Sequence, residues 1–154
     1  MINKIINGIC KAINAEFGDE YEIHTESIEQ GLKEPCFSIM CINPTNNLFR
    51  QNRYFRKNQF CIHYFPSTED EKEECQEVTE RLYDCLEYIE IDEETKTMGT
   101  DMNTKFSDGV LNFFVNYDMY VKKDKKEEIP KIEDCNYNTN IKEGWFRYEK
   151  RKKQ

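Results

Sequence analysis

The chain has 154 residues, of which 38% are apolar and 13% aromatic, so it can form one domain with a real core and is too aromatic to be disordered throughout. Thirty acidic residues against 22 basic ones give a net charge of −8, which argues against a dedicated binder of nucleic acid or of anionic membranes. No apolar run approaches the roughly 20 residues that cross a bilayer, and polar residues interrupt the N-terminus too often for a signal peptide. We therefore expect a protein that stays in the cytoplasm where it is made.

The cysteine pattern also indicates a reducing compartment. Seven cysteines is an odd number, they lack the close spacing of a disulfide framework, and several fall on apolar phases where a reduced thiol packs like a small hydrophobe. Cys61 and His63 would share one face of a strand, but two ligands do not make a zinc site, and His24 is distant in sequence. We expect structural thiols and neither a metal nor another cofactor. The cysteines are residues 10, 36, 41, 61, 75, 85 and 135.

The first half of the chain predicts one helix followed by strands. Apolar residues recur at three- and four-residue steps over residues 2–17, which is typical of an amphipathic helix, and Gly18 stands where a glycine would end it. A short extended piece at 21–25 and a loop at 26–35 follow. Alternation over 36–43 then predicts a strand that Pro44 stops. Further along, residues 43–52 are expected to form a polar turn, and 53–65 a longer strand.

The second half predicts another helix and a hairpin. Thr68 and Glu71 fit a capping box, after which apolar residues at helical spacing reach Ile89. Thirteen acids and two bases occupy residues 69–94. Residues 98–106 alternate like a strand, residues 107–109 (SDG) predict a tight turn, and residues 110–121 form a return strand whose two faces both carry apolar side chains. Runs of strands with two helices imply an α+β domain, in which the helices pack on a mainly antiparallel sheet.

The C-terminal segment has a different composition. Residues 122–154 carry eleven bases and seven acids, a net +4, so the rest of the chain carries −12. We therefore divide the chain into a domain at 1–123 and a charged arm at 124–154. The two parts have opposite charge, and a head-to-tail ring or stack of copies would bring them together.

Catalytic signatures are scarce. The chain has no nucleophile elbow, phosphate-binding loop, dinucleotide fingerprint or zinc-protease motif. One alternative remains open, a small enzyme that uses the Cys61 thiol with His63 as its base. The acids of the second helix are more simply explained as a solvated face. We expect a protein that is not an enzyme.

Two segments, residues 43–57 and residues 145–153, instead have the composition of an assembly surface. Both mix aromatic and arginine side chains, which are enriched at protein interfaces. The alternative for the first segment is that Tyr54 or Phe55 belongs to the core and the arginines are merely solvated. For the second, the alternative is a solvated terminus. The candidate subunit or tube interface comprises Leu48, Phe49, Arg50, Arg53, Tyr54, Arg56, Trp145, Phe146 and Arg147.

Three phrases carry a family resemblance: QGLKEPCF at 30–37, NRY at 52–54 leading to IHYFP at 62–66, and DGVL at 108–111 leading to FFVNYD at 113–118. In these phrases and in element order, residues 1 to about 123 resemble the small tail terminator proteins of prophages and phage-tail-like bacteriocins of Gram-positive bacteria. Residues 122–154 have no counterpart in this resemblance.

The resemblance implies a structural role without cofactor or reaction. Tail terminators form a hexameric ring on the last ring of the tail tube, stop tube polymerisation, and in contractile tails hold the sheath end. The implied partners are further copies of the chain, the tube protein, and the sheath and neck proteins, and the implied location is the virion tail. A head–tail connector would have similar size and symmetry and is the alternative.

Overall fold

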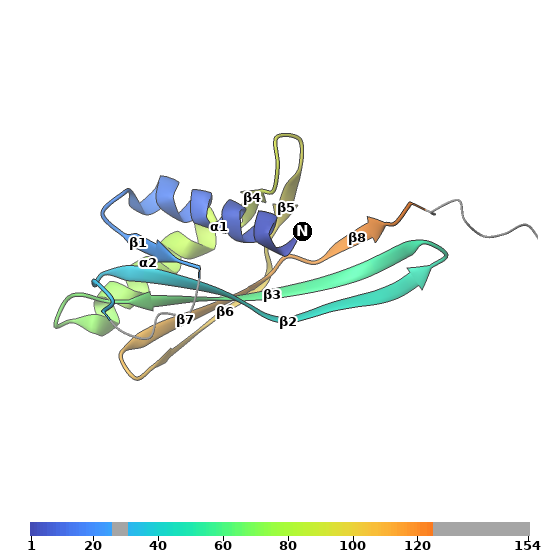
Figure 1. The fold of residues 1–154 in the computed structure, drawn as a ribbon. Helices are drawn as coiled ribbons and strands as arrows, with labels where there is room; N and C mark the ends of the chain where they lie inside the picture. Colours follow the sequence, from blue (N-terminus) through green and yellow to red (C-terminus); the bar gives the residue numbers. More distant parts are fainter. Residues whose placement is uncertain (26–30, 125–154) are drawn as a thin grey trace, which may run out of the picture. The chain divides into compact units, whose positions relative to one another are not determined.

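The computed structural model describes residues 1–25 and 31–124 and shows two helices on one face of a six-stranded sheet (Figure 1). The strand order is β1-β2-β3-β7-β6, with β8 added beside β3, and all pairings are antiparallel except β1 with β2. The predicted α+β class is therefore confirmed. The elements are α1 (Ile2–Phe17), β1 (Glu22–His24), β2 (Cys36–Arg50), β3 (Arg53–Phe65), α2 (Glu71–Cys85), β4 (Tyr88–Glu90), β5 (Lys96–Met98), β6 (Thr100–Ser107), β7 (Val110–Asn116) and β8 (Met119–Lys122).

The core lies between the two helices and one face of the sheet. The stripe predicted on α1 is buried there, and Phe17 at its end stacks on Phe37 of β2 with ring centroids 4.9 Å apart. On α2, Tyr83 packs on Phe113 of β7 at 5.4 Å. Every second side chain of the central strands points into this layer, as period-two patterning requires. Its sheet residues include Phe37, Ile39, Phe60, Ile62, Tyr64, Leu111, Phe113 and Val115.

The predicted start of the second helix is wrong in detail. The helix begins at Glu71 after Asp70, without the capping box of Thr68 and Glu71. Glu74, one turn inside, instead reaches back over the preceding loop. Its carboxylate accepts hydrogen bonds from the backbone N–H and the hydroxyl of Thr68 at 2.9 and 2.5 Å, and from the Tyr64 hydroxyl at 2.5 Å. A tertiary contact with β3 thus replaces the local one.

Glu74 makes the stability of this corner depend on pH. Burial alone would raise the pKa of its carboxyl, but the hydrogen bonds from Thr68 and Tyr64 outweigh burial and hold the pKa below its usual value. The carboxylate therefore stabilises the fold above the unfolded-state pKa of about 4.3, and this contribution disappears as the pH falls through the lower folded-state pKa. We expect Glu74→Gln to cost about 1 kcal/mol at pH 7, a value reduced by solvent screening of the half-exposed group, and progressively less below pH 4.

Urea unfolding of wild type and Glu74→Gln between pH 3 and 7 measures this difference. Glu73→Gln is the matched control, since Glu73 is exposed and has no hydrogen bond within the described residues. A cost for Glu74→Gln that does not change with pH would contradict the assignment.

The strand predicted at 36–43 does not stop at Pro44 but continues to Arg50 as one side of a long hairpin. Pro44 is tolerated because it lies in a bulge, where Asn43 has a φ of 49° and the register slips between Ile42 and Thr45. The polar turn expected over 43–52 is therefore reduced to Gln51 and the residue after it.

The second half also departs from the predicted pattern. The apolar stripe assigned to one helix up to Ile89 is interrupted, because α2 ends at Cys85 and Ile89 lies in the small β4–β5 hairpin. Residues 98–106 are divided at Gly99, where a Cβ would stand 2.6 Å from the Leu86 carbonyl oxygen. The tight turn is confirmed, since Asp108 and Gly109 both have positive φ, as a type I′ hairpin needs.

The predicted return strand 110–121 is two strands. Both β7 and β8 pair with β3, β7 against its second half and β8 against its first. The chain crosses between them at Tyr117 and Asp118. Asn58 of β3 holds this crossing, because its side-chain amide donates to the Tyr117 carbonyl at 3.0 Å and its backbone N–H donates to the Asp118 carboxylate at 3.0 Å. We call these three residues the crossover cluster.

Candidate assembly interface

The far half of the β2–β3 hairpin extends beyond the helices, together with β8 (Figure 1). We call residues 45–57 and 119–123 the strand arm. Strand β8 closes one side of it by pairing Tyr120 with Phe55 and Lys122 with Arg53. The strand arm buries little of its own surface, since the helices do not cover it, so its side chains are available for contacts with other molecules.

One face of the strand arm carries an aromatic cluster. The Tyr120 ring packs against Phe55 with centroids 4.8 Å apart and against Phe49 at 5.1 Å. Phe49 and Tyr120 remain 61% and 64% exposed, and the neighbouring Leu48 is 63% exposed. Exposed aromatic side chains held in place by one another are typical of interface anchors.

The strand arm is also strongly basic. It contains six cations and no acidic residue, and none of the six takes part in an ion pair within residues 1–25 and 31–124. The Arg56 guanidinium donates to the Asn46 side chain at 3.0 Å, and the Lys123 ammonium lies 4.1 Å from the centre of the Tyr54 ring. The cations are Arg50, Arg53, Arg56, Lys57, Lys122 and Lys123.

The structure brings the first predicted segment together, although as paired strands rather than a loop. Leu48 lies opposite Tyr54, and Arg50 opposite Arg53. Tyr54 is half-buried, so it contributes less to the exposed surface than expected. The other predicted residues, Trp145, Phe146 and Arg147, lie outside the described part of the chain. Whether any of these nine residues contacts a partner stays a prediction.

Sequence reasoning missed the contribution of β8. Tyr120 and Lys122 join the strand arm only because β8 leaves β7 and pairs with the first half of β3. The half-apolar outer face of residues 110–121 was the one available signal, and it did not show which half of β3 these residues would meet.

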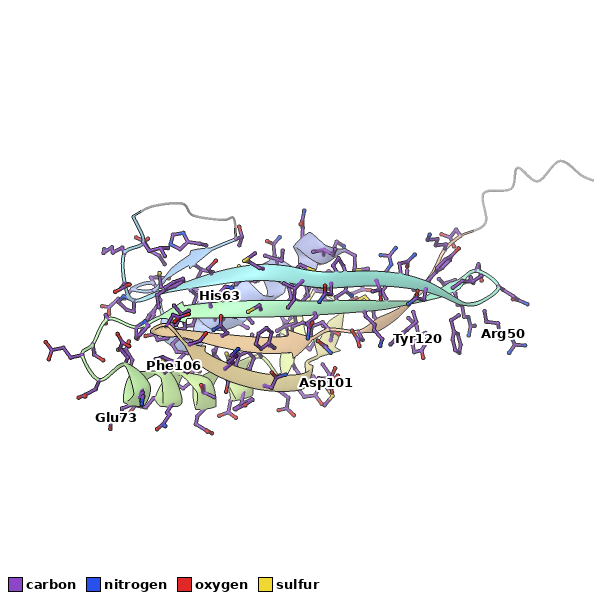
Figure 2. The ribbon with its side chains drawn as sticks, turned by 90° about the horizontal axis from the view of Figure 1, so that it is seen from below. Arg50, His63, Glu73, Asp101, Phe106 and Tyr120 are labelled. Atoms are coloured by element: carbon purple, nitrogen blue, oxygen red, sulfur yellow. The ribbon has the colours of Figure 1, made fainter. Side chains whose placement is uncertain are left out.

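A second surface lies at the opposite end of the domain. Here α2 and β6 border a groove of about 250 Å³, and Figure 2 shows Glu73 and Phe106 at this end, with Arg50 and Tyr120 at the other. Phe106 is 38% exposed beside the groove. The groove is lined by Lys72, Cys75, Gln76, Thr79, Thr104, Phe106 and Leu111.

The Cys61 and His63 pair lies on the uncovered face of the sheet. The Cys61 sulfur is 3.9 Å from His63 Nδ1, but that nitrogen is 2.7 Å from the Asn112 amide oxygen, to which its N–H donates. Nδ1 is therefore not free to take the thiol proton. Burial raises the pKa of Cys61 to about 11, so the thiol stays protonated at neutral pH. No group of three possible metal ligands occurs among the described residues.

These contacts predict that Cys61 is structural. We expect Cys61→Ala to cost about 1 kcal/mol of stability, because a buried sulfur is lost, and to leave the rest of the fold unchanged. We also expect Cys61 to be alkylated slowly by iodoacetamide at pH 7 in the folded protein. Peptide mapping of the alkylated thiols measures this rate, and a Cys61 that reacts faster than the other thiols would contradict the prediction.

A comparison with models of known protein families identifies the family of this chain. A family model described as phage tail terminator protein matches residues 4–129. This chain belongs to the phage tail terminator family. The match covers α1 to β8, which includes the strand arm and the groove. No curated protein matches the chain.

A solved structure has a similar fold. It is the sheath/tube terminator of an extracellular contractile injection system, PVC, in the extended state. The TM-score is 0.51 at 13% sequence identity, over 82% of this chain and 58% of that one, so the chain spans less than two thirds of that terminator. At this identity the likeness concerns the fold alone.

Family membership sets the broad role of this terminator. It is a structural component of the virion tail and not an enzyme, since the family consists of structural tail proteins. The alternative of a Cys61-dependent enzyme is thereby set aside. Within the described residues, none of the helices is long and apolar enough to cross a membrane.

Proposed function

We propose that this terminator caps the last ring of the tail tube as a hexameric ring and stops tube polymerisation. The observation that carries the proposal is the family match over residues 4–129, which spans every helix and strand of the fold. The ring also holds the sheath end of a contractile tail or joins the neck. Its partners are further copies of the chain, the tube protein, and the sheath and neck proteins.

The distribution of surface side chains supports an assembly role. The strand arm offers exposed aromatic and arginine side chains on three paired strands, with β3 held between β2 and β8, which is a surface that a folded monomer leaves unused. We propose that Leu48, Phe49, Arg50 and Arg53 lie at a subunit or tube contact. Residues 124–154 then act as a separate arm, with Trp145, Phe146 and Arg147 as a further contact.

We also propose the source and the place of synthesis. The phrases at 30–37, 52–66 and 108–118 point to a prophage or a phage-tail-like bacteriocin of a Gram-positive host, whose cytoplasm makes the protein. A contractile tail is supported by the fold shared with the PVC sheath/tube terminator.

Deletion of the gene from its particle cluster, followed by electron microscopy of the particles, tests the proposal. Tubes of uncontrolled length that regain normal length when the wild-type chain is supplied would support a cap. Tails of correct length without heads would assign the protein to the neck as a connector. Unchanged, functional particles would refute the assembly role.

A further inference from the structure

We infer that the tip of the strand arm of one copy docks in the groove between α2 and β6 of a second copy, with Phe49 as its apolar anchor. This inference rests on the proposed ring and names the surfaces that build it. Two surfaces of the chain carry this inference, the groove between α2 and β6 and the tip of the strand arm. They lie at opposite ends of the domain (Figure 2).

The groove can hold an aromatic ring. Its volume of about 250 Å³ exceeds the roughly 150 Å³ of an apolar cavity that holds benzene. Its floor and walls include Leu111, Cys75 and the half-exposed ring of Phe106. Nothing in the described part of the chain fills it, so among residues 1–25 and 31–124 its apolar surface faces water, and covering that surface would be favourable.

An acidic stripe runs beside the groove. Glu73, Glu77, Glu80 and Asp84 recur at steps of four, three and four residues, so they share one face of α2, and all are exposed. Three of them directly follow the groove residues Lys72, Gln76 and Thr79, which places the stripe about 100° around the helix from the groove. None of the four is in an ion pair within the described ranges.

The tip of the strand arm has the complementary properties. Phe49 projects an exposed ring that Tyr120 supports at 5.1 Å, so it loses little side-chain freedom on binding. Arg50 and Arg53 are exposed on either side of the hairpin turn. An aromatic anchor in the groove would bring these guanidinium groups to the acidic stripe, where arginine and carboxylate pair in two parallel hydrogen bonds.

The positions of the two surfaces favour another copy as the occupant. The tip of the strand arm and the groove belong to the same chain but differ in shape and charge. A contact between the tip of one copy and the groove of another is therefore head-to-tail. A head-to-tail contact repeats from copy to copy and closes into a ring when the rotation allows it. Within each domain, the strand arm carries six positive charges and the acidic stripe carries four negative ones. These opposite charges steer the strand arm of one copy toward the acidic stripe of the next.

Reciprocal charge reversal in the deletion strain tests the contact. One variant carries Arg50→Glu with Arg53→Glu, and the other Glu73→Arg with Glu77→Arg. Each alone places like charges across the contact, and we expect loss of length control. When both are expressed together, every arm meets an oppositely charged helix in an alternating ring, and we expect tails of normal length. Circular dichroism of each purified variant confirms that it is folded.

Two control pairs have the same charge changes elsewhere on the exposed surface. Lys11→Glu with Lys33→Glu matches the arm variant, and Asp19→Arg with Glu20→Arg matches the helix variant. We expect both to restore normal tails. If the controls fail like the test pairs, or if the test pairs restore normal tails alone or fail together, the arm-to-groove contact is refuted.

A photo-crosslink identifies the occupant directly. With benzoyl-phenylalanine in place of Phe49, irradiated particles should yield a crosslink to peptides of α2 or β6 from a second copy. A crosslink to the tube or sheath protein instead would refute this inference and leave the capping role intact. A deletion strain that makes normal tails would refute the capping role itself, so the two failures are distinguishable.

Discussion

Tyr117→Ala is expected to lower the free energy of unfolding by about 3–5 kcal/mol, a large part of the 5–15 kcal/mol typical of a whole domain. Tyr117 is fully buried, its ring packs on Phe60 at a centroid distance of 6.1 Å, and its hydroxyl donates to the Leu86 carbonyl at 2.8 Å. The substitution removes the ring and leaves a cavity where α2 ends on the sheet. Thermal unfolding followed by circular dichroism should show a midpoint lower by about 10–20 °C.

Two tyrosine variants separate the causes. Tyr117→Phe keeps the ring but leaves the Leu86 carbonyl without its donor, and we expect a loss of about 1–3 kcal/mol. Tyr120→Ala removes a ring three residues along the same segment that is 64% exposed, and we expect a loss below about 1 kcal/mol. Equal losses for Tyr117→Ala and Tyr120→Ala would contradict the buried position of Tyr117.

Local patterns predicted the local features of the fold. The stripe on residues 2–17 sufficed for α1, because an amphipathic helix buries one face whatever packs on it. The Asp108 and Gly109 pair sufficed for the hairpin, because few other residues accept positive φ at both turn positions. Alternation over 53–65 likewise matches β3.

The wrong predictions concern residues whose conformation depends on distant partners. Pro44 would end a strand that is paired on both sides, but it is tolerated at the bulge of β2, which lies beyond the three residues that β1 pairs, and the sequence does not show where β2 has a free edge. Glu74 takes the place of the expected cap because Tyr64 of β3 lies within hydrogen-bonding distance. The division of 110–121 depends on Asn58, which lies 59 residues before Tyr117.

The candidate interface, like the fold, could be predicted from the sequence only in its local part. The mixture of aromatic and arginine side chains between Leu48 and Arg56 is local and was visible in the sequence. The groove was not, since it forms where α2 meets β6, and neither element shows by itself that an apolar surface between them stays open. Composition can therefore point to the exposed aromatic and arginine side chains of the strand arm, but not to the groove that we infer accepts them.

Asn58→Ala is expected to weaken the fold and, more strongly, the strand arm. Asn58 is 3% exposed, and the substitution leaves the Tyr117 carbonyl without a donor in a buried place, which costs about 1–3 kcal/mol. The crossover cluster sets where β8 begins, so its loss should loosen the pairing of β8 with β3 before that of β7. Amide hydrogen exchange should increase more in Met119–Lys122 than in Val110–Asn116.

The consequence for function follows from the aromatic cluster. The Tyr120 ring packs against Phe49 and Phe55 only while β8 is paired with β3. When β8 loosens, Phe49 therefore loses its contact with Tyr120. We therefore expect Asn58→Ala to impair length control at a temperature where the domain is still folded. Asn47→Ala, at an exposed position of the same arm, is the matched control and should change stability by less than about 0.5 kcal/mol. If exchange in β8 stays at the wild-type rate, the crossover cluster does not control the strand arm, and the arm is rigid by virtue of its hairpin alone.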